Sequence, residues 1–219
     1  MLERELQWER NLFFFLNGSD SSFWDSFFHF YSNQWTWIPF YLCFLFVFIY
    51  RKTGAEIKRD WKEIVWAILC VIAVFILCDQ ISSGFFKPLF QRFRPTHHPD
   101  FRDLVKIVFD ERGGKYGFIS GHAANTFGFA TFTALLFRNR LLTFTVFLFA
   151  IVTAYSRVYL GLHFISDVVA GALVGMLVGY GVYRIYRWKV KKTVVYPQWK
   201  IYLLCAVYIV SVIVLFIIK

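Results

Sequence analysis

Long apolar runs separated by short charged segments limit this chain to a few kinds of fold. Hydrophobic residues make up 58% of the 219 residues, and the mean hydropathy is +0.52. These values are too apolar for a soluble domain and typical of a protein that crosses the membrane several times. We predict one membrane-integral domain over residues 1–219, an all-α helix bundle with about six transmembrane helices. The predicted spans are residues 35–50, 64–81, 120–137, 141–155, 163–183 and 200–218.

The N-terminal segment, residues 1–34, has a different pattern. Residues 3–16 are typical of an amphipathic helix, which ends near Asn17 and Gly18, a helix-stop signal. A second aromatic patch follows, from Phe23 to Tyr31. Both stretches are too short or too polar to cross a bilayer, so we expect them to lie in the plane of the membrane interface.

Basic residues set the expected orientation of the chain and its expected partners. The formal net charge is +10, and lysines and arginines gather after the first, third and fifth predicted spans. By the positive-inside rule that side is cytoplasmic. Residues 87–167 and both termini then face outward, toward the periplasm if the protein lies in a bacterial inner membrane. No basic stripe with a nucleic-acid-binding pattern occurs, so we expect the bilayer and an anionic lipid as partners, and no nucleic acid.

Cysteines and paired histidines give no sign of a metal site. The four cysteines each lie in an apolar run and form no Cys/His cluster, so we expect neither a disulfide nor zinc. His97 and His98 are neighbours beside a proline, a setting in which histidines are mostly solvated. The sequence therefore predicts no metal and no cofactor, and it leaves the oligomeric state open.

Three polar clusters interrupt the apolar pattern between residues 87 and 167. They are KPLFQRFRP at Lys87–Pro95, SGH at Ser120–His122 and SRVYLGLHFISD at Ser156–Asp167. Ionisable groups inside or at the edge of a membrane are costly and usually functional. His163 and Asp167 are four residues apart, so on a helix they would share a face. A carboxylate against one imidazole nitrogen would leave the other nitrogen free to act as nucleophile or base.

Together the clusters resemble the signature of the type 2 phosphatidic acid phosphatase family. Its pattern is K-x6-R-P, then P-S-G-H, then S-R-x5-H-x3-D. The first and third motifs are complete here, and the second departs only at Ile119, where the family usually has proline. We expect this departure to affect how the loop joins the helix more than the chemistry.

The resemblance implies a role for each matching residue. His163 would attack phosphorus and form a phosphohistidine, Asp167 would orient it, and His122 would protonate the leaving oxygen and then activate water. The expected phosphate-binding residues are Lys87, Arg94, Ser120, Gly121 and Arg157. No metal is implied. Asp79 and Asn125 are weaker candidates, for supporting the basic cluster and His122 respectively, and each has an ordinary structural explanation as well.

The function expected from the resemblance is a membrane phosphatase acting on a phosphate monoester or pyrophosphate of a lipid. The motifs recognise phosphate alone, so undecaprenyl pyrophosphate, the phosphates of lipid A, phosphatidylglycerol phosphate and phosphatidate all remain open. The short chain mildly favours the first two. The alternatives are an oxidoreductase like the vanadate-dependent haloperoxidases, which share a similar phosphate pocket but are soluble, and a non-enzymatic transport or scaffold protein, which would not need an intact triad.

One glycine pattern predicts a helix contact. Gly171, Gly175 and Gly179 recur at every fourth position of the fifth predicted span. Such a face allows two helices to approach closely. We therefore expect His163 and Asp167 to lie on a helix that is tightly packed into the bundle.

Overall fold

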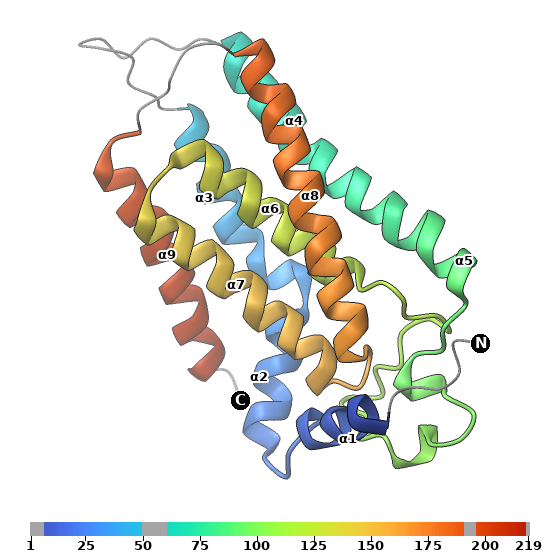
Figure 1. Cartoon of the computed structure of the whole chain (residues 1–219). Helices are drawn as coiled ribbons and strands as arrows, with labels where there is room; N and C mark the ends of the chain where they lie inside the picture. Colours follow the sequence, from blue (N-terminus) through green and yellow to red (C-terminus); the bar gives the residue numbers. More distant parts are fainter. Residues whose placement is uncertain (1–6, 50–60, 191–195, 218–219) are drawn as a thin grey trace.

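The chain forms a bundle of long helices, and the computed structural model describes residues 7–49, 61–190 and 196–217 (Figure 1). Within these ranges there is no strand, apart from one isolated bridge between Phe93 and Tyr116. The all-α prediction is therefore confirmed. The helices are α1 (Gln7–Leu16), α2 (Ser22–Ser32), α3 (Ile38–Ile49), α4 (Trp61–Asp79), α5 (Lys87–Phe90), α6 (Gly121–Phe137), α7 (Arg140–Tyr159), α8 (Ile165–Lys189) and α9 (Gln198–Ile217).

Each predicted span coincides with a helix, but the lengths differ from expectation. Four helical segments are long and apolar enough to cross a membrane: Trp61–Phe90, Arg140–Tyr159, Ile165–Lys189 and Gln198–Ile217. The first does not end near residue 81 as predicted. It continues through a π-helical stretch, Gln80–Phe86, into α5. Helices α3 and α6, with 12 and 17 residues, are shorter than a full crossing needs, so the number of crossings stays a prediction.

The glycine face of α8 packs against α6, as the spacing predicts. A Cβ atom on Gly171, Gly175 or Gly179 would collide with the backbone carbonyl oxygen of Ser120, Ala124 or Gly128 respectively. Only glycine allows so close an approach of two backbones. This contact continues to the N-terminus of α6, where the N–H of Ser120 donates to the carbonyl oxygen of Asp167 at 2.9 Å. The seam therefore brings the second and third polar clusters together.

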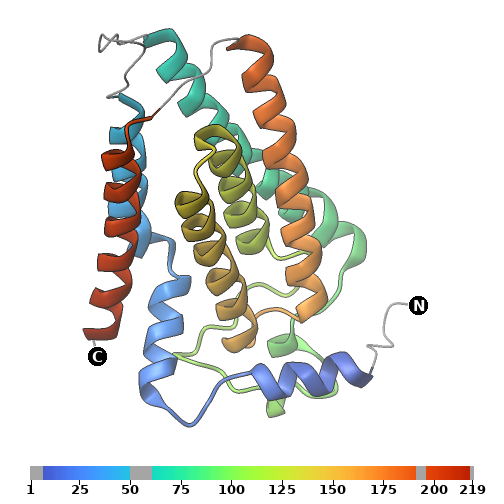
Figure 2. The same cartoon turned by 60° about the vertical axis from the view of Figure 1, so that its left-hand side comes forward.

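The two N-terminal helices differ from each other. Helix α1 lies across one end of the bundle (Figure 2), with Phe13 fully buried and Trp8, Leu12 and Phe15 exposed. That outward apolar face suits a membrane interface, which remains a prediction for α1. Helix α2 was expected in the same plane, but it runs along the bundle and buries Phe27, Phe28 and Tyr31 in the main core. Helix α2 is therefore an integral part of the bundle, because its aromatic side chains find partners on α7 and α9.

The polar clusters gather at the end of the bundle where α1 lies. Helices α6 and α8 begin there and α7 ends there, while α3, α6 and α8 have their C-terminal ends at the opposite end (Figures 1 and 2). The long connection between α5 and α6 folds over the same end through two short 3₁₀ turns, Pro95–His97 and Arg102–Leu104. Loop residues and helix termini from distant parts of the sequence therefore meet in one place.

Candidate active site

The loop between α7 and α8 carries the candidate nucleophile. His163 precedes the first residue of α8, and Asp167 lies in the first turn of that helix. The prediction that both share one helical face is therefore wrong in detail. They still meet, with His163 Nδ1 3.5 Å from Asp167 Oδ2. The same oxygen accepts the N–H of Phe164 at 3.0 Å, so the helix start itself fixes the carboxylate. Both side chains are almost completely buried.

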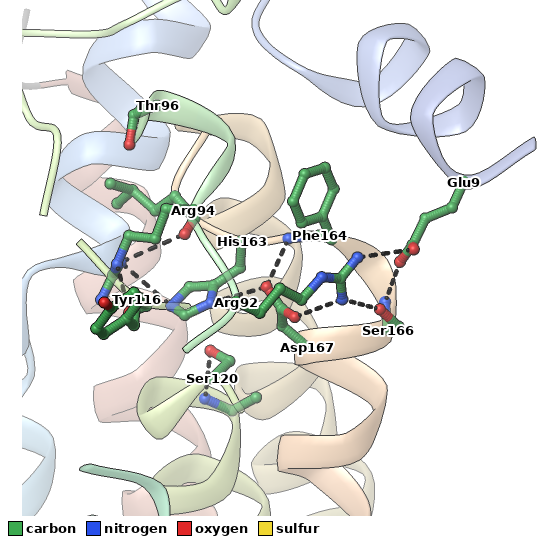
Figure 3. Close-up of polar contacts among 12 residues, drawn as sticks. Glu9, Arg92, Arg94, Thr96, Tyr116, Ser120, His163, Phe164, Ser166 and Asp167 are labelled. Atoms are coloured by element: carbon green, nitrogen blue, oxygen red, sulfur yellow. Dashed lines mark hydrogen bonds and ion pairs between the residues drawn. The ribbon is translucent and has the colours of Figure 1, made fainter. Parts of the chain in front are cut away.

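Arg94 faces the other side of the His163 ring. Its Nη1 lies 3.3 Å from His163 Nε2 and donates to the carbonyl oxygen of Leu162 at 3.3 Å. Its Nε donates to the carbonyl oxygen of Tyr116 at 3.2 Å (Figure 3). These carbonyls fix the guanidinium beside Nε2, so Arg94 can contact an oxygen of a phosphoryl group that approaches this nitrogen.

The environment of His163 favours the neutral ring. Burial lowers the pKa of His163 well below its ordinary value of 6.5, and the nearby positive charges of Arg94, Arg157 and Lys87 lower it further. With Nδ1 turned to Asp167, the unprotonated nitrogen is Nε2, which faces Arg94 Nη1 at 3.3 Å and carries the lone pair that would attack an electrophile. Burial also lowers the pKa of Arg94, which the negative charges of Asp167 and Glu111 partly offset.

Arg157 and His122 line a cavity of about 340 Å³ on the neighbouring side of the site. Arg157 lies in the last turn of α7. It donates to the hydroxyl of Ser32, and its Nη1 lies 3.5 Å from Glu111 Oε1. Its Nε is buried without a hydrogen-bond partner among the described residues. A buried cationic donor of this kind is suited to an anion.

The remaining predicted residues lie around this centre. Ser120 caps α6, accepting the N–H of Ala123 at 3.5 Å. Lys87 donates to Ser83 at 3.1 Å, and Ser83 donates to Asp79 at 3.4 Å, so Asp79 reaches Lys87 through one hydroxyl. Gly121 packs closely against Ser82, whose hydroxyl oxygen would lie 3.0 Å from a Cβ atom at position 121. The buried Oδ1 of Asn125 has no hydrogen-bond partner among the described residues, so its support of His122 stays a prediction.

Two charged residues near the dyad were not predicted. Arg92, from the first polar cluster, donates through Nη1 to Asp167 Oδ1 at 2.8 Å. Glu9 on α1 accepts from Arg92 Nη2 at 2.9 Å. The family pattern leaves position 92 free, so the motif could not have found this arginine. For Glu9 the only signal is that it lies four residues before Phe13, on the buried face of α1.

These features define a class of protein. A membrane helix bundle that buries a histidine, its carboxylate partner and two arginines at one end matches the arrangement expected of an integral membrane phosphatase. The profile of the PAP2 superfamily matches residues 64–191, more than half of the chain. The chain therefore belongs to the PAP2 superfamily, as its motifs predict.

Named relatives agree with this assignment. The chain is 46% identical over 185 residues to a lipid A 4′-phosphatase of Porphyromonas gingivalis, an alignment covering 84% of this chain and 75% of that protein. It is 36% identical over 179 residues to a lipid A 4′-phosphatase of Bacteroides thetaiotaomicron, covering 81% and 75%. The crystal structure of Aquifex aeolicus LpxE superposes with a TM-score of 0.58 at 26% identity, covering 84% of this chain and 99% of that one. The protein is a membrane lipid phosphatase, a hydrolase of phosphate esters.

Proposed function

We propose that the protein removes the 4′-phosphate of lipid A at the outer face of the bacterial inner membrane. The observation that carries this choice among lipid phosphates is the chemistry of the cavity beside His122 and Arg157. Besides these two residues it is lined by His29, Ser32, Asn33, Gln34, Trp35 and Glu111. The identity to two lipid A 4′-phosphatases supports the same substrate.

The cavity suits a sugar better than an isoprenyl pyrophosphate. Its volume of about 340 Å³ lies within the usual range for small-molecule sites. Amide, hydroxyl and carboxylate side chains can pair with sugar hydroxyls and acylamide groups. An isoprenyl pyrophosphate offers only phosphate oxygens and hydrocarbon, and Glu111 would repel a second phosphate. A glucosamine ring carrying the reacting phosphate therefore matches the lining groups.

In the first chemical step, Nε2 of His163 attacks phosphorus and the bond from phosphorus to the sugar oxygen breaks. His122 gives that oxygen a proton, so the sugar leaves as an alcohol. The phosphoryl group remains on the histidine, whose Nδ1–H faces Asp167, and the carboxylate stabilises the positive ring. Arg94, Arg157 and Lys87 stabilise the charge on the phosphoryl oxygens.

In the second step, His122 takes a proton from water and the water oxygen attacks phosphorus. The phosphorus–nitrogen bond breaks, phosphate leaves and His163 returns to its neutral form. Ser120 and the N-terminus of α6 offer further donors to the phosphate, because the first N–H groups of a helix lack partners within it.

The proposed substrate is tested by phosphate release from purified protein in mixed micelles. Doubly phosphorylated lipid A is the main substrate, with undecaprenyl pyrophosphate and phosphatidate as competitors at the same surface concentration. Mass spectrometry of the product identifies which phosphate was lost. We expect loss of the 4′-phosphate with the highest kcat/KM of the three. A higher kcat/KM for undecaprenyl pyrophosphate would overturn the assignment.

A variant of a cavity residue tests whether the cavity recognises the sugar of lipid A. Gln34→Ala removes an exposed amide from the lining while leaving the catalytic groups in place. We expect KM for lipid A to rise by about fivefold, as for the loss of one uncharged hydrogen bond, with KM for phosphatidate unchanged. Gln198→Ala, at the opposite end of the bundle, is the control. Equal effects of Gln34→Ala on both lipids would rule out sugar recognition by this cavity.

A further inference from the structure

A chain of four charged or ionisable side chains runs from α1 to the candidate nucleophile. Glu9 Oε2 lies 2.9 Å from Arg92 Nη2, and Arg92 Nη1 lies 2.8 Å from Asp167 Oδ1. Asp167 Oδ2 then lies 3.5 Å from His163 Nδ1. Figure 3 shows these side chains pointing toward one another from α1, the first polar cluster and the start of α8.

Glu9 is buried and fully hydrogen-bonded within this arrangement. It is only 5% exposed, and its second oxygen, Oε1, accepts the N–H of Ser166 at 2.8 Å. Burying a carboxylate is costly unless the charge is paired and hydrogen-bonded, and here both oxygens have partners. Phe13, one turn later on α1, packs edge-on against Phe164 with ring centroids 5.4 Å apart. Helix α1 therefore packs against the start of α8.

Arg92 is held in one orientation by groups around it. Nη1 also donates to the hydroxyl of Ser166 at 2.5 Å, and the guanidinium lies over the Phe164 ring, 4.4 Å from its centroid. A long side chain with several rotatable bonds needs such partners to keep one conformation. Glu9 supplies the partner on the side away from the active site, so the position of Arg92 depends on α1.

Arg92 in turn controls Asp167. One carboxylate oxygen accepts from Arg92, and the other accepts from the N–H of Phe164 and faces His163. With both oxygens engaged, the carboxylate cannot rotate away from the imidazole. Partners of this kind, one step removed from the reacting group, commonly change activity by about 10–100-fold in metal sites.

We propose that Glu9 is a positioning residue for catalysis, acting through Arg92 to hold Asp167 against His163. Helix α1 thus completes the active site from outside the segment that carries the motifs. Glu9 touches neither the substrate nor the reacting atoms. The inference rests on the proposed role of His163 as the nucleophile.

The charge balance gives the inference a specific signature. Among the described residues Arg92 forms ion pairs with Glu9 and Asp167, and Glu9→Gln removes the charge of the first while keeping the size of the side chain. The amide has one oxygen for the two donors that Glu9 accepts, Arg92 Nη2 and the N–H of Ser166, so its NH2 group must face one of them. The potential at His163 becomes more positive, so the acid limb of kcat/KM should move to lower pH. Asp167, neutralised more completely by Arg92, supports the positive phosphohistidine less well, so kcat should fall.

The test compares full-length wild type, Glu9→Gln, Phe13→Ala and Gln7→Ala in mixed micelles of doubly phosphorylated lipid A. Phe13→Ala loosens the apolar contact of α1 but keeps the carboxylate, and Gln7→Ala changes an exposed residue of the same helix. We expect Glu9→Gln to lower kcat by about tenfold, with KM within twofold, an acid limb at lower pH and a Tm close to wild type. Gln7→Ala should match wild type.

Two results would overturn the inference. The first is a kcat for Glu9→Gln within twofold of wild type. The second is a loss of activity in Glu9→Gln that is proportional to the loss of folded protein, with an unshifted pH profile and the same behaviour in Phe13→Ala. Glu9 would then be only a structural contact of α1. Failure of the proposed function gives different results. If wild type does not act on lipid A, the substrate is wrong and the variants are compared on phosphatidate. If His163→Ala keeps wild-type activity, the proposed nucleophile is wrong.

Discussion

Arg94 Nη1 and His163 Nε2 lie 3.3 Å apart, although 69 positions separate the two residues in the sequence. This contact places a cationic donor beside the nitrogen that would attack phosphorus. A phosphoryl group bound to Nε2 would have an oxygen within reach of Arg94. The geometry therefore links binding of the phosphate to its transfer, and the following predictions test the parts of that link.

Replacement of the nucleophile should abolish turnover. We expect His163→Ala to reduce kcat by several orders of magnitude, since a lost nucleophile costs far more than about tenfold. The measurement is phosphate release by purified protein, with acid-labile phosphoprotein trapped in wild type and absent from the variant. Activity within tenfold of wild type, in a variant that remains folded and extractable, would contradict a covalent mechanism.

Arg157→Lys separates the shape of the guanidinium from its charge. The planar guanidinium can hold two phosphoryl oxygens, which lysine cannot do, and its buried Nε has no partner among the described residues. We expect kcat to fall about 10²-fold, as for the loss of one donor to a developing oxyanion. Arg138→Lys, at the opposite end of the bundle, is the control. Rates close to wild type that decrease with added salt would show that Arg157 only attracts the anion.

The pH profile should reflect the lowered pKa of His163. Burial and then the cations around the ring favour the neutral form, so the nucleophile stays active as pH falls through 6.5. The acid limb of kcat/KM should therefore lie below that value. Arg94→Gln removes one of these cations and should move the limb upward, whereas Arg102→Gln, in an exposed 3₁₀ turn, should not. An acid limb of kcat/KM above pH 6.5 in wild type would contradict a neutral His163. The substrate for this measurement must be fully ionised at that pH, so that its own protonation does not produce the limb.

The same pKa shift has a consequence for stability. In the unfolded chain the histidine binds a proton below its ordinary pKa of 6.5, while the folded protein does not until a lower pH. The unfolded state therefore gains protons first, and the free energy of unfolding should fall as pH drops through this window. Thermal unfolding of wild type and His163→Gln at pH 7 and pH 5 measures how far each protein is destabilised by the change in pH. This loss of stability should be smaller in the variant.

Inhibitors should distinguish cationic side chains from a bound metal ion. We expect EDTA to leave activity nearly unchanged, because the site supplies Lys87, Arg94 and Arg157 for the phosphoryl charge. Orthovanadate should inhibit, since it adopts the five-coordinate geometry of phosphorus in the transition state. Loss of activity with chelator, restored by one divalent ion, would show that a metal takes part.

Cysteine labelling tests the proposed outward orientation. In a background with the four native cysteines replaced, a cysteine at Arg112 lies on the active-site side and one at Lys189 on the opposite side. An impermeant thiol reagent should label the first and not the second in cells whose outer membrane is permeabilised. The reverse labelling would place the active site in the cytoplasm.

Much of this arrangement follows from local sequence patterns. Apolar runs predict the helices because burial in hydrocarbon favours internally hydrogen-bonded segments. The glycines at positions 171, 175 and 179 predict a close helix contact, because the lack of a side chain is itself the geometric requirement, and the structure shows that the partner is α6. The spacing from His163 to Asp167 predicts their contact as well, although through a turn and a helix start instead of one helical face. In each case the prediction depends on residues that are only a few positions apart in the sequence.

The tertiary structure decided which charges meet. Arg92 and Glu9 are 83 positions apart, and nothing in either local sequence selects the other as its partner. A buried charge needs a counter-charge, but which of the chain's basic and acidic residues supplies it depends on how helices pack and loops close. The same holds for Arg157 with Ser32 and Glu111. Motif spacing could therefore select the candidate reacting groups, and only the folded chain shows how α1 is joined to them.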